Sequence, residues 1–208
     1  MTSRVELFNR VLLDFGFARI DDPDDPGYEA TTLRELYPRA RDEVLTSRPG
    51  IGWVSGIKRA VLAVVAEAEP LHDYSFAYQL PVQDKCLEVL DLLDAGGQFI
   101  PLDGAHYIVE GGRLYTNERN VAIRYMARID VNEMAPHLVQ ILTARLSMRA
   151  AVPLKESMGL RQQMEADYER LYLEGCAIDD RVRGSRMMAD RPRSRIGGGM
   201  GRQRFRRG

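Results

Sequence analysis

The residue types here that most readily bind a metal ion are histidine and cysteine, and their spacing argues against a metal site. His72, His106 and His137 are scattered, and none has a second histidine one helical turn away, as a zinc-binding helix requires. Cys86 and Cys176 are too few for a metal cluster and indicate no disulfide framework. We therefore expect no metal and no cofactor, structural roles for the histidines, and a buried apolar role for Cys86.

Two other patterns resemble ligand sites only in part. Asp21, Asp22, Asp24 and Asp25 lack the alternating spacing and terminal glutamate of a calcium-binding loop, so we interpret them as a solvated acidic turn. The glycine run at 197–201 has no expected strand before it and no helix after it, which favours a flexible hinge over a phosphate loop. Since the chain also lacks a Gly-x-Ser-x-Gly elbow, we expect it not to be an enzyme.

A row of aromatic residues allows two interpretations. Tyr74, Phe76 and Tyr78 alternate, so on a strand they would share one face. Such a row could stack nucleic-acid bases. No basic residue is interleaved with these aromatics, and we therefore favour packing in a core or against another protein.

The uneven distribution of charge is the strongest functional signal. The whole chain has a net charge of −1, yet residues 180–208 contain ten arginines and two aspartates. That segment is therefore +8 and the other 179 residues are −9, which suggests that the basic segment contacts something anionic. It has too few large apolar residues to form a core, so we expect a flexible arm of 29 residues that reaches roughly 90 to 100 Å when extended.

Eight residues of this arm are the candidate partner-binding residues: Arg191, Arg193, Arg195, Arg202, Arg204, Phe205, Arg206 and Arg207. The arginines could contact phosphates or dock on a neighbouring subunit, and Phe205 is the arm's only aromatic anchor. A simple solubility tail is the remaining alternative.

Helical spacing of apolar residues predicts four helices, over residues 3–16, 31–57, 132–150 and 157–175. Pro38 falls inside the second of these patterns, where it either kinks the helix or marks a later start. Pro136 is tolerated in a first turn, and Pro153 is expected to end the third helix.

Between these helices, alternation of apolar and polar residues predicts an inserted β region at about 60–130. The expected strands cover residues 60–65, 75–80, 85–92, 106–109, 113–116 and 120–129, although a helix running through Trp53 and Ile57 into the first is an alternative. Pro81–Asp84 is expected to join the second and third strands as a hairpin, and Glu110-Gly111-Gly112 the fourth and fifth.

This order of elements predicts an α+β fold: a bundle of N- and C-terminal helices with an inserted small antiparallel β-sheet and a flexible C-terminal arm. Residues 1–179 would form one domain, and residues 180–208 the basic arm. The longest apolar run, 60–66, is far shorter than the roughly 20 residues of a membrane helix. The N-terminus has no secretory signal pattern, so we expect a soluble protein made in a reducing compartment.

Two segments in a fixed order resemble a known family. The first is Tyr37-Pro38 followed by Arg41-Asp42-Glu43-Val44-Leu45. The second is Phe76-Ala77-Tyr78-Gln79-Leu80-Pro81 followed by Cys86-Leu87-Glu88-Val89. Together they resemble the head-to-tail adaptors of short-tailed bacteriophages, the tubular tail protein A group, over roughly residues 3–155. The family's His-Pro-Trp-Asn-Phe is altered here to Ser47-Arg48-Pro49-Gly50-Ile51-Gly52-Trp53.

The resemblance implies a structural virion protein, assembled in the host cytoplasm. It would form a ring of twelve subunits between the portal protein and the tail nozzle, with double-stranded DNA passing through the centre and no membrane contact. The alternative is a nucleic-acid-binding protein that acts through its basic arm. A cell-wall-degrading tail enzyme is a third hypothesis, but it lacks a catalytic constellation.

Overall fold

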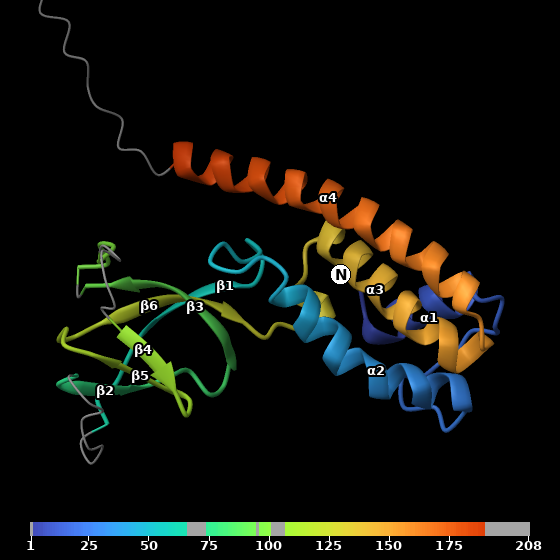
Figure 1. Cartoon of the computed structure of the whole chain (residues 1–208), viewed down its shortest axis with the longest axis horizontal. Helices are drawn as coiled ribbons and strands as arrows, with labels where there is room; N and C mark the ends of the chain where they lie inside the picture. Colours follow the sequence, from blue (N-terminus) through green and yellow to red (C-terminus); the bar gives the residue numbers. More distant parts are fainter. Residues whose placement is uncertain (1, 66–73, 95, 101–106, 190–208) are drawn as a thin grey trace, which may run out of the picture.

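The computed structural model describes residues 2–65, 74–94, 96–100 and 107–189, which form a helical lobe and a β lobe (Figure 1). The helices are α1 (Arg4–Asp14), α2 (Tyr28–Leu45), α3 (Pro136–Lys155) and α4 (Met158–Ala189), with a short 3₁₀ turn η1 (Val131–Glu133) before α3. The strands are β1 (Ile57–Val61), β2 (Phe76–Gln79), β3 (Cys86–Leu93), β4 (Tyr107–Glu110), β5 (Arg113–Thr116) and β6 (Ala122–Ala127). Helices thus flank a strand region, and the α+β prediction is confirmed.

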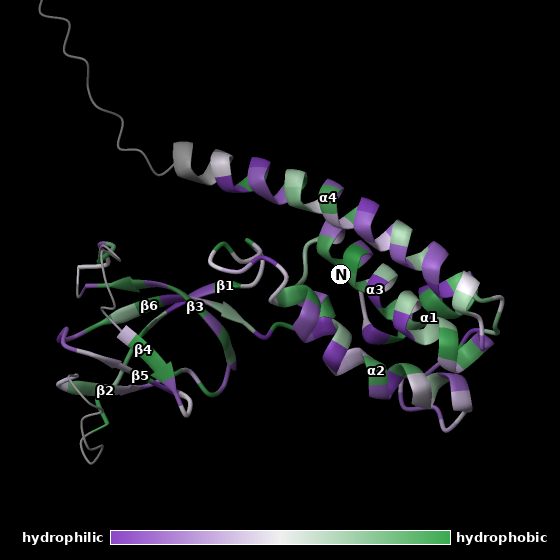
Figure 2. Cartoon of the chain, in the orientation of Figure 1, coloured by the Kyte–Doolittle hydropathy of each residue, from purple (hydrophilic) through white to green (hydrophobic). Residues whose placement is uncertain are grey.

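Helix α3 is the centre of the helical lobe, because α1, α2 and α4 all pack against it. Its residues Leu138, Ile141, Leu142 and Leu146 are fully buried. Figure 2 shows apolar residues along α3, whereas polar and apolar residues alternate along α4. At Gly175 of α4 a side-chain carbon would lie 2.5 Å from the Cδ1 of Ile141, so the two helices pack closely there and a larger residue would displace Ile141.

Local signals set the ends of several helices. Ser3 caps α1 through a reciprocal capping box with Glu6, which satisfies backbone amides at the first turn. Pro136 begins α3, as expected. Pro153 was expected to end α3, but the helix continues to Lys155 and closes at Glu156, whose φ is 50°. Pro153 therefore lies in the last turn, where it supplies no amide for the carbonyl of Arg149, and the helix ends two residues later.

The β lobe contains two antiparallel three-stranded sheets, in the orders β1-β6-β3 and β2-β5-β4. The segment after β1 joins them, since the Val65 amide donates to Ala77 and the Gln79 amide donates to Ala63. The Gly111-Gly112 hairpin between β4 and β5 is confirmed. Both glycines have positive φ, 56° and 76°, as a tight hairpin turn requires.

The other predicted hairpin is wrong. Strand β2 pairs with β5 in one sheet, and β3 pairs with β6 in the other. The turn at Pro81–Asp84 therefore carries the chain from one sheet to the other. A local turn signal cannot reveal this, because it marks a change of direction and not the partner of each strand.

The second predicted helix, 31–57, is wrong at both ends. Helix α2 begins at Tyr28 and ends at Leu45, and Pro38 lies within it. Gly50 and Gly52 then adopt φ values of 69° and 67°, which a helix excludes, and the strand β1 has begun by Ile57. Trp53 consequently lies in a loop, 46–56, that connects the lobes.

Helix α4 is longer than predicted. It has 32 residues, about 48 Å at the rise of an α-helix, and it continues past residue 175 to Ala189. Residues 180–189 are therefore helical, and the expected start of the arm at 180 is wrong. In Figure 1 this end of α4 projects beyond the rest of the helical lobe. Among the described helices, none combines the length and apolar character needed to cross a membrane.

Candidate functional site

The eight arm residues singled out in the sequence lie beyond Ala189, outside the described residues. The described residues include α4, the helix that leads to the arm. A set of five side chains, Arg48, Trp53, Asp179, Asp180 and Arg183, ties α4 to the loop 46–56 and is called the α4 clamp below.

Asp179 is the centre of the α4 clamp. Its side chain is only 1% exposed, and one oxygen, Oδ2, accepts hydrogen bonds from Arg48 at 2.9 Å and from Arg183 at 3.2 Å. The other oxygen, Oδ1, accepts from the backbone amide of Val54 at 3.0 Å. Three donors thus satisfy a carboxylate that burial alone would strongly disfavour.

The two arginines of the α4 clamp fix the loop from opposite directions. Arg48, itself 7% exposed, also donates to Asp180 at 2.6 Å. Burial alone would lower the pKa of Arg48, but the hydrogen bond to Asp180 and nearby negative groups outweigh it, so the pKa is raised. Arg183 donates to the carbonyl oxygens of Gly52 at 2.7 Å and Ile51 at 3.2 Å. The loop therefore follows the position of α4.

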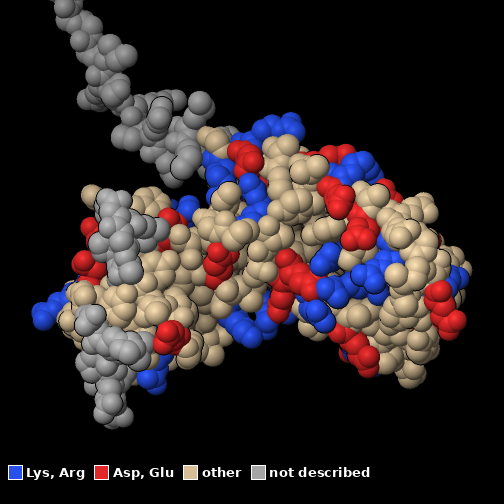
Figure 3. Space-filling model, viewed as in Figure 1, with Lys and Arg blue, Asp and Glu red and all other residues tan. Residues whose placement is uncertain are grey.

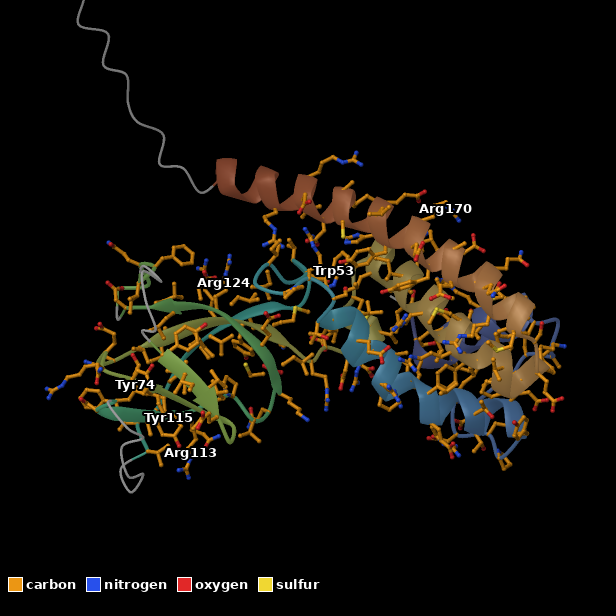
Figure 4. All side chains as sticks on the ribbon, in the orientation of Figure 1. Trp53, Tyr74, Arg113, Tyr115, Arg124 and Arg170 are labelled. Atoms are coloured by element: carbon orange, nitrogen blue, oxygen red, sulfur yellow. The ribbon has the colours of Figure 1, made fainter. Side chains whose placement is uncertain are left out.

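Trp53 supplies the apolar part of the α4 clamp. It is fully buried beneath α4 at the junction of the lobes, as Figure 4 shows. Its Nε1 donates to the carbonyl of Val44 at 2.8 Å, which also accepts hydrogen bonds from Ser47 at the end of α2. Its ring meets Tyr172 edge to face at 6.0 Å, and the Arg48 guanidinium lies 5.1 Å from the ring centroid.

His137 is the one histidine inside the described ranges, and it borders the α4 clamp. Its Nε2 lies 3.6 Å from Asp179 Oδ1 and is buried without a hydrogen-bond partner in the described structure. Within the described residues no three histidine, cysteine, aspartate or glutamate side chains are placed to hold a metal ion. His72 and His106 lie outside those residues. The chemistry of this site is therefore that of an ion-pair network.

A second network lies between α2 and α3. Arg39, Arg145 and Arg149 surround the single carboxylate of Glu43, and these three arginines are called the arginine cluster below. Arg145 donates to Glu43 Oε2 at 3.0 Å, Arg149 at 2.9 Å, and Arg39 donates to Oε1 at 3.1 Å. Burial alone would raise the pKa of Glu43, but the hydrogen bonds from Arg149 and Arg145 outweigh it and lower the pKa. The arginine cluster and Glu43 together have three positive charges and one negative charge.

The acidic turn, residues 21–25, is well ordered by its own side chains. Asp22 accepts the amide of Asp24 at 2.8 Å, and Asp25 accepts the amide of Gly27 at 2.7 Å. Arg34 forms an ion pair with Asp24, at 3.7 Å. Asp21, Asp22 and Asp24 are exposed, in accordance with a solvated acidic turn.

The aromatic row packs as expected at its buried end. Tyr78 is fully buried, and its hydroxyl donates to the Glu118 carbonyl at 2.9 Å. Phe76 is partly buried, with its ring centroid 6.4 Å from that of Tyr78. Arg119 lies over the Phe76 ring at 5.3 Å, a basic partner that comes from outside the row's own strand.

One further hollow, of about 580 Å³, lies between α1, α3 and α4. Its charged lining residues are Arg10, Asp14, Asp167 and Arg170, of which Arg170 lies on the outer side of α4 (Figure 4). Burial raises the pKa of Asp14, the hydrogen bond from Ser147 opposes that shift, and the charge of Asp167 adds to it. Its two acidic and two basic lining residues balance in charge, so the hollow favours neither an anion nor a cation.

Sequence reasoning missed the residues of the α4 clamp. Arg48 and Asp179 are 131 positions apart, and neither belongs to a local motif. The available signal was indirect, because Arg48 and Trp53 lie in the segment that departs from the adaptor pattern. No model of a known protein family matches the chain, and no curated protein matches it either.

Proposed function

We propose that this protein is a structural component of a phage virion. It would be a head-to-tail adaptor whose ring joins the portal to the tail nozzle and forms part of the DNA ejection channel. Its action would be assembly, without catalytic turnover. A ring of twelve subunits is the expectation from the family resemblance, and a heterologous contact whose rotation closes produces such a ring.

The residues that carry the family resemblance support this proposal, because three polar side chains of its first segment hold α2 against the rest of the chain. Tyr37 donates to Asp130, and burial with that hydrogen bond raises the pKa of Tyr37 to about 12. Asp42 accepts from Arg128 at 2.9 Å. Glu43 holds the arginine cluster. The motif is therefore a set of tertiary contacts, as a resemblance in fold requires.

The observation that carries the proposal is the anchoring of α4. The α4 clamp fixes a long helix that extends past the other helices and leads directly to the Arg/Gly-rich arm. On this helix Leu173 is 69% exposed, and Ile178 and Val182 are 38% and 39% exposed. A rigid projecting helix with apolar residues on its surface is suited to subunit contacts.

The test is negative-stain imaging of the chain co-expressed with the portal protein from the same genome. The expected result is portal rings with an added tier. Truncation of the chain at Ala189 removes the arm but keeps Arg183 and the α4 clamp. Truncation at Asp180 would remove the arm and also Arg183, and so damage the clamp. Loss of the added tier on truncation at Ala189 would assign portal contact to the arm.

The second candidate is nucleic-acid binding through the arm, favoured by the seven arginines and single aspartate in residues 190–208. It predicts DNA affinity that falls steeply with salt and disappears on truncation at Ala189. A monomer that ignores the portal yet binds DNA in this way would replace the adaptor proposal.

A further inference from the structure

We propose that the arginine cluster is a binding surface between copies of this chain, and that its occupant is the acidic turn of the neighbouring copy. The inference rests on the proposed ring, since it assigns the two surfaces that would meet in it. It follows from the charge, exposure and position of the two regions.

The arginine cluster has an excess of two positive charges. Arg145 and Arg149 are 23% and 20% exposed, and Arg39 is 75% exposed, yet all three share the carboxylate of Glu43. Arg145 is also held over the Tyr168 ring, 5.0 Å from its centroid. Like charges held this close repel one another, so a second carboxylate at this place would relieve the repulsion. Guanidinium groups bind carboxylates with two parallel hydrogen bonds and retain unused donors here.

The acidic turn has the opposite imbalance. It contains four aspartates in five residues. Arg34 forms a long ion pair with one of them, Asp24, at 3.7 Å. The hydrogen bonds of Asp22 and Asp25 to the backbone hold the turn in one conformation, so little order is lost when it binds. Its charge therefore complements the arginine cluster in sign.

The two regions cannot meet within one copy. The acidic turn precedes the first residue of α2, Tyr28, whereas Glu43 lies fifteen residues later, about 22 Å along a continuous helix. In Figure 1 the connection between α1 and α2 lies at the outer end of the helical lobe. In Figure 3 basic side chains gather near the middle of the helical lobe, and acidic side chains lie both beside them and at the outer end. An acidic turn that binds the arginine cluster must therefore come from a second copy.

Because the two surfaces differ, the contact is heterologous, and each copy can both give and receive one. Repeated contacts of this kind close into a ring or continue as a filament. Since the charged groups are partly exposed, added salt should weaken the association.

Substitutions of opposite charge test the inference in the full chain. The turn variant is Asp21→Lys with Asp24→Lys, which takes the four aspartates of the turn from −4 to no net charge and spares the two that bind the backbone. The cluster variant is Arg39→Glu with Arg149→Glu. Sedimentation velocity, alone and with the portal protein, should show each variant associating at least tenfold more weakly than the wild type.

The decisive step is mixing the two variants. With alternating subunits, the introduced lysines of one variant face the introduced glutamates of the other at half of the contacts. At the other half the unchanged acidic turn faces the unchanged arginine cluster, so an equal mixture should restore assembly. A misfolded variant could not do this, and restoration therefore also reports on folding. Combining all four substitutions in one chain should restore assembly as well.

A control matched to the turn variant carries the same change in net charge at another place. Glu110→Lys with Glu118→Lys lies on exposed positions of the β lobe and should leave association unchanged. Rings that form normally from both variants, or a mixture no better than either variant alone, would overturn this inference and leave the adaptor proposal standing. A wild-type chain that neither self-associates nor adds to the portal would overturn both.

Discussion

The α4 clamp and the arginine cluster are both networks of arginines and carboxylates, but they differ in charge balance and exposure. In the α4 clamp, Arg48 and Arg183 face Asp179 and Asp180, so the charges balance, and Asp179 is almost fully buried. In the arginine cluster, three arginines face one glutamate, and every member is at least 20% exposed. The first arrangement suits an internal joint. The second leaves charge available to another molecule.

The difference follows from the cost of burial. A buried carboxylate without compensating donors is strongly destabilising, so a buried network must balance its charges within the chain. A network at the surface is screened by water and ions, and it can remain unbalanced at modest cost. Exposure and charge balance together therefore indicate which network stabilises the fold and which is suited to binding.

The largest effect is expected from Asp179→Ala. It leaves Arg48 and Arg183 without their shared buried partner and should lower the free energy of unfolding by about 3 to 5 kcal/mol. Denaturant unfolding measures this change, and hydrogen exchange should show faster exchange in the second half of α4. The control is Asp180→Asn, whose side chain is 57% exposed and should cost about 1 kcal/mol or less. Equal effects of the two variants would contradict the clamp.

The next effect is expected from Trp53→Phe. It removes the indole donor to Val44 and leaves part of a fully buried space unfilled, so the loss should be about 1 to 3 kcal/mol. Tyr172→Phe is a milder comparison, since it removes the hydroxyl that donates to Ser47 but keeps the ring beside Trp53. A Trp53→Phe variant as stable as the wild type would show that this hydrogen bond is unimportant to the joint.

Glu43→Gln should cost about 1 to 2 kcal/mol, since it removes the only negative charge among three arginines. Because the site is partly exposed, added salt should recover part of this loss, whereas the loss from Asp179→Ala should change little with salt. Thermal unfolding at low and high ionic strength separates the two cases. The same response to salt at both sites would break the distinction between them.

The same carboxylate predicts a pH dependence. The pKa of Glu43 is lower in the folded protein than its ordinary value, so its stabilisation is present above that value and is lost as the pH falls below about 4. In Glu43→Gln that part of the acid-induced loss should be missing. An identical decline in stability for both proteins between pH 5 and pH 3, measured by denaturant titration, would contradict it.

The smallest effect is expected from Asp14→Asn and should be favourable. Asp14 is a carboxylate at the C-terminal end of α1, where the helix dipole disfavours negative charge, and burial raises its pKa. Asparagine removes the charge and keeps an acceptor for Ser147, so stability at neutral pH should rise by about 0.3 to 1 kcal/mol. Because a raised carboxyl pKa opposes folding only while the group is ionised, the gain should shrink as the pH falls towards 4.

Local signals accounted for much of the fold. The glycine pair at 111–112 gave the β4–β5 hairpin, and helical spacing gave α1, α3 and the first part of α4. These local signals failed where a residue or strand distant in sequence determines the pairing. The choice of β5 and not β3 as the partner of β2 depends on packing across the lobe.

The same limit explains the missed site. The segment after residue 179 reads as a flexible arm by composition, yet Asp179 and Arg183, four residues apart, pair on α4 and bind the loop 46–56. Only the fold brings Arg48 to them. By contrast, the acidic turn was recognisable from sequence, because its residues are contiguous.

The most direct test of the account is a three-dimensional electron-microscopy map of the full chain bound to its portal protein. The expected map shows one added ring in which the acidic turn of each subunit faces Arg39, Arg145 and Arg149 of the next. Portal particles without an added ring would contradict the adaptor function itself, and a ring whose subunits meet elsewhere would contradict the role of the unbalanced cluster.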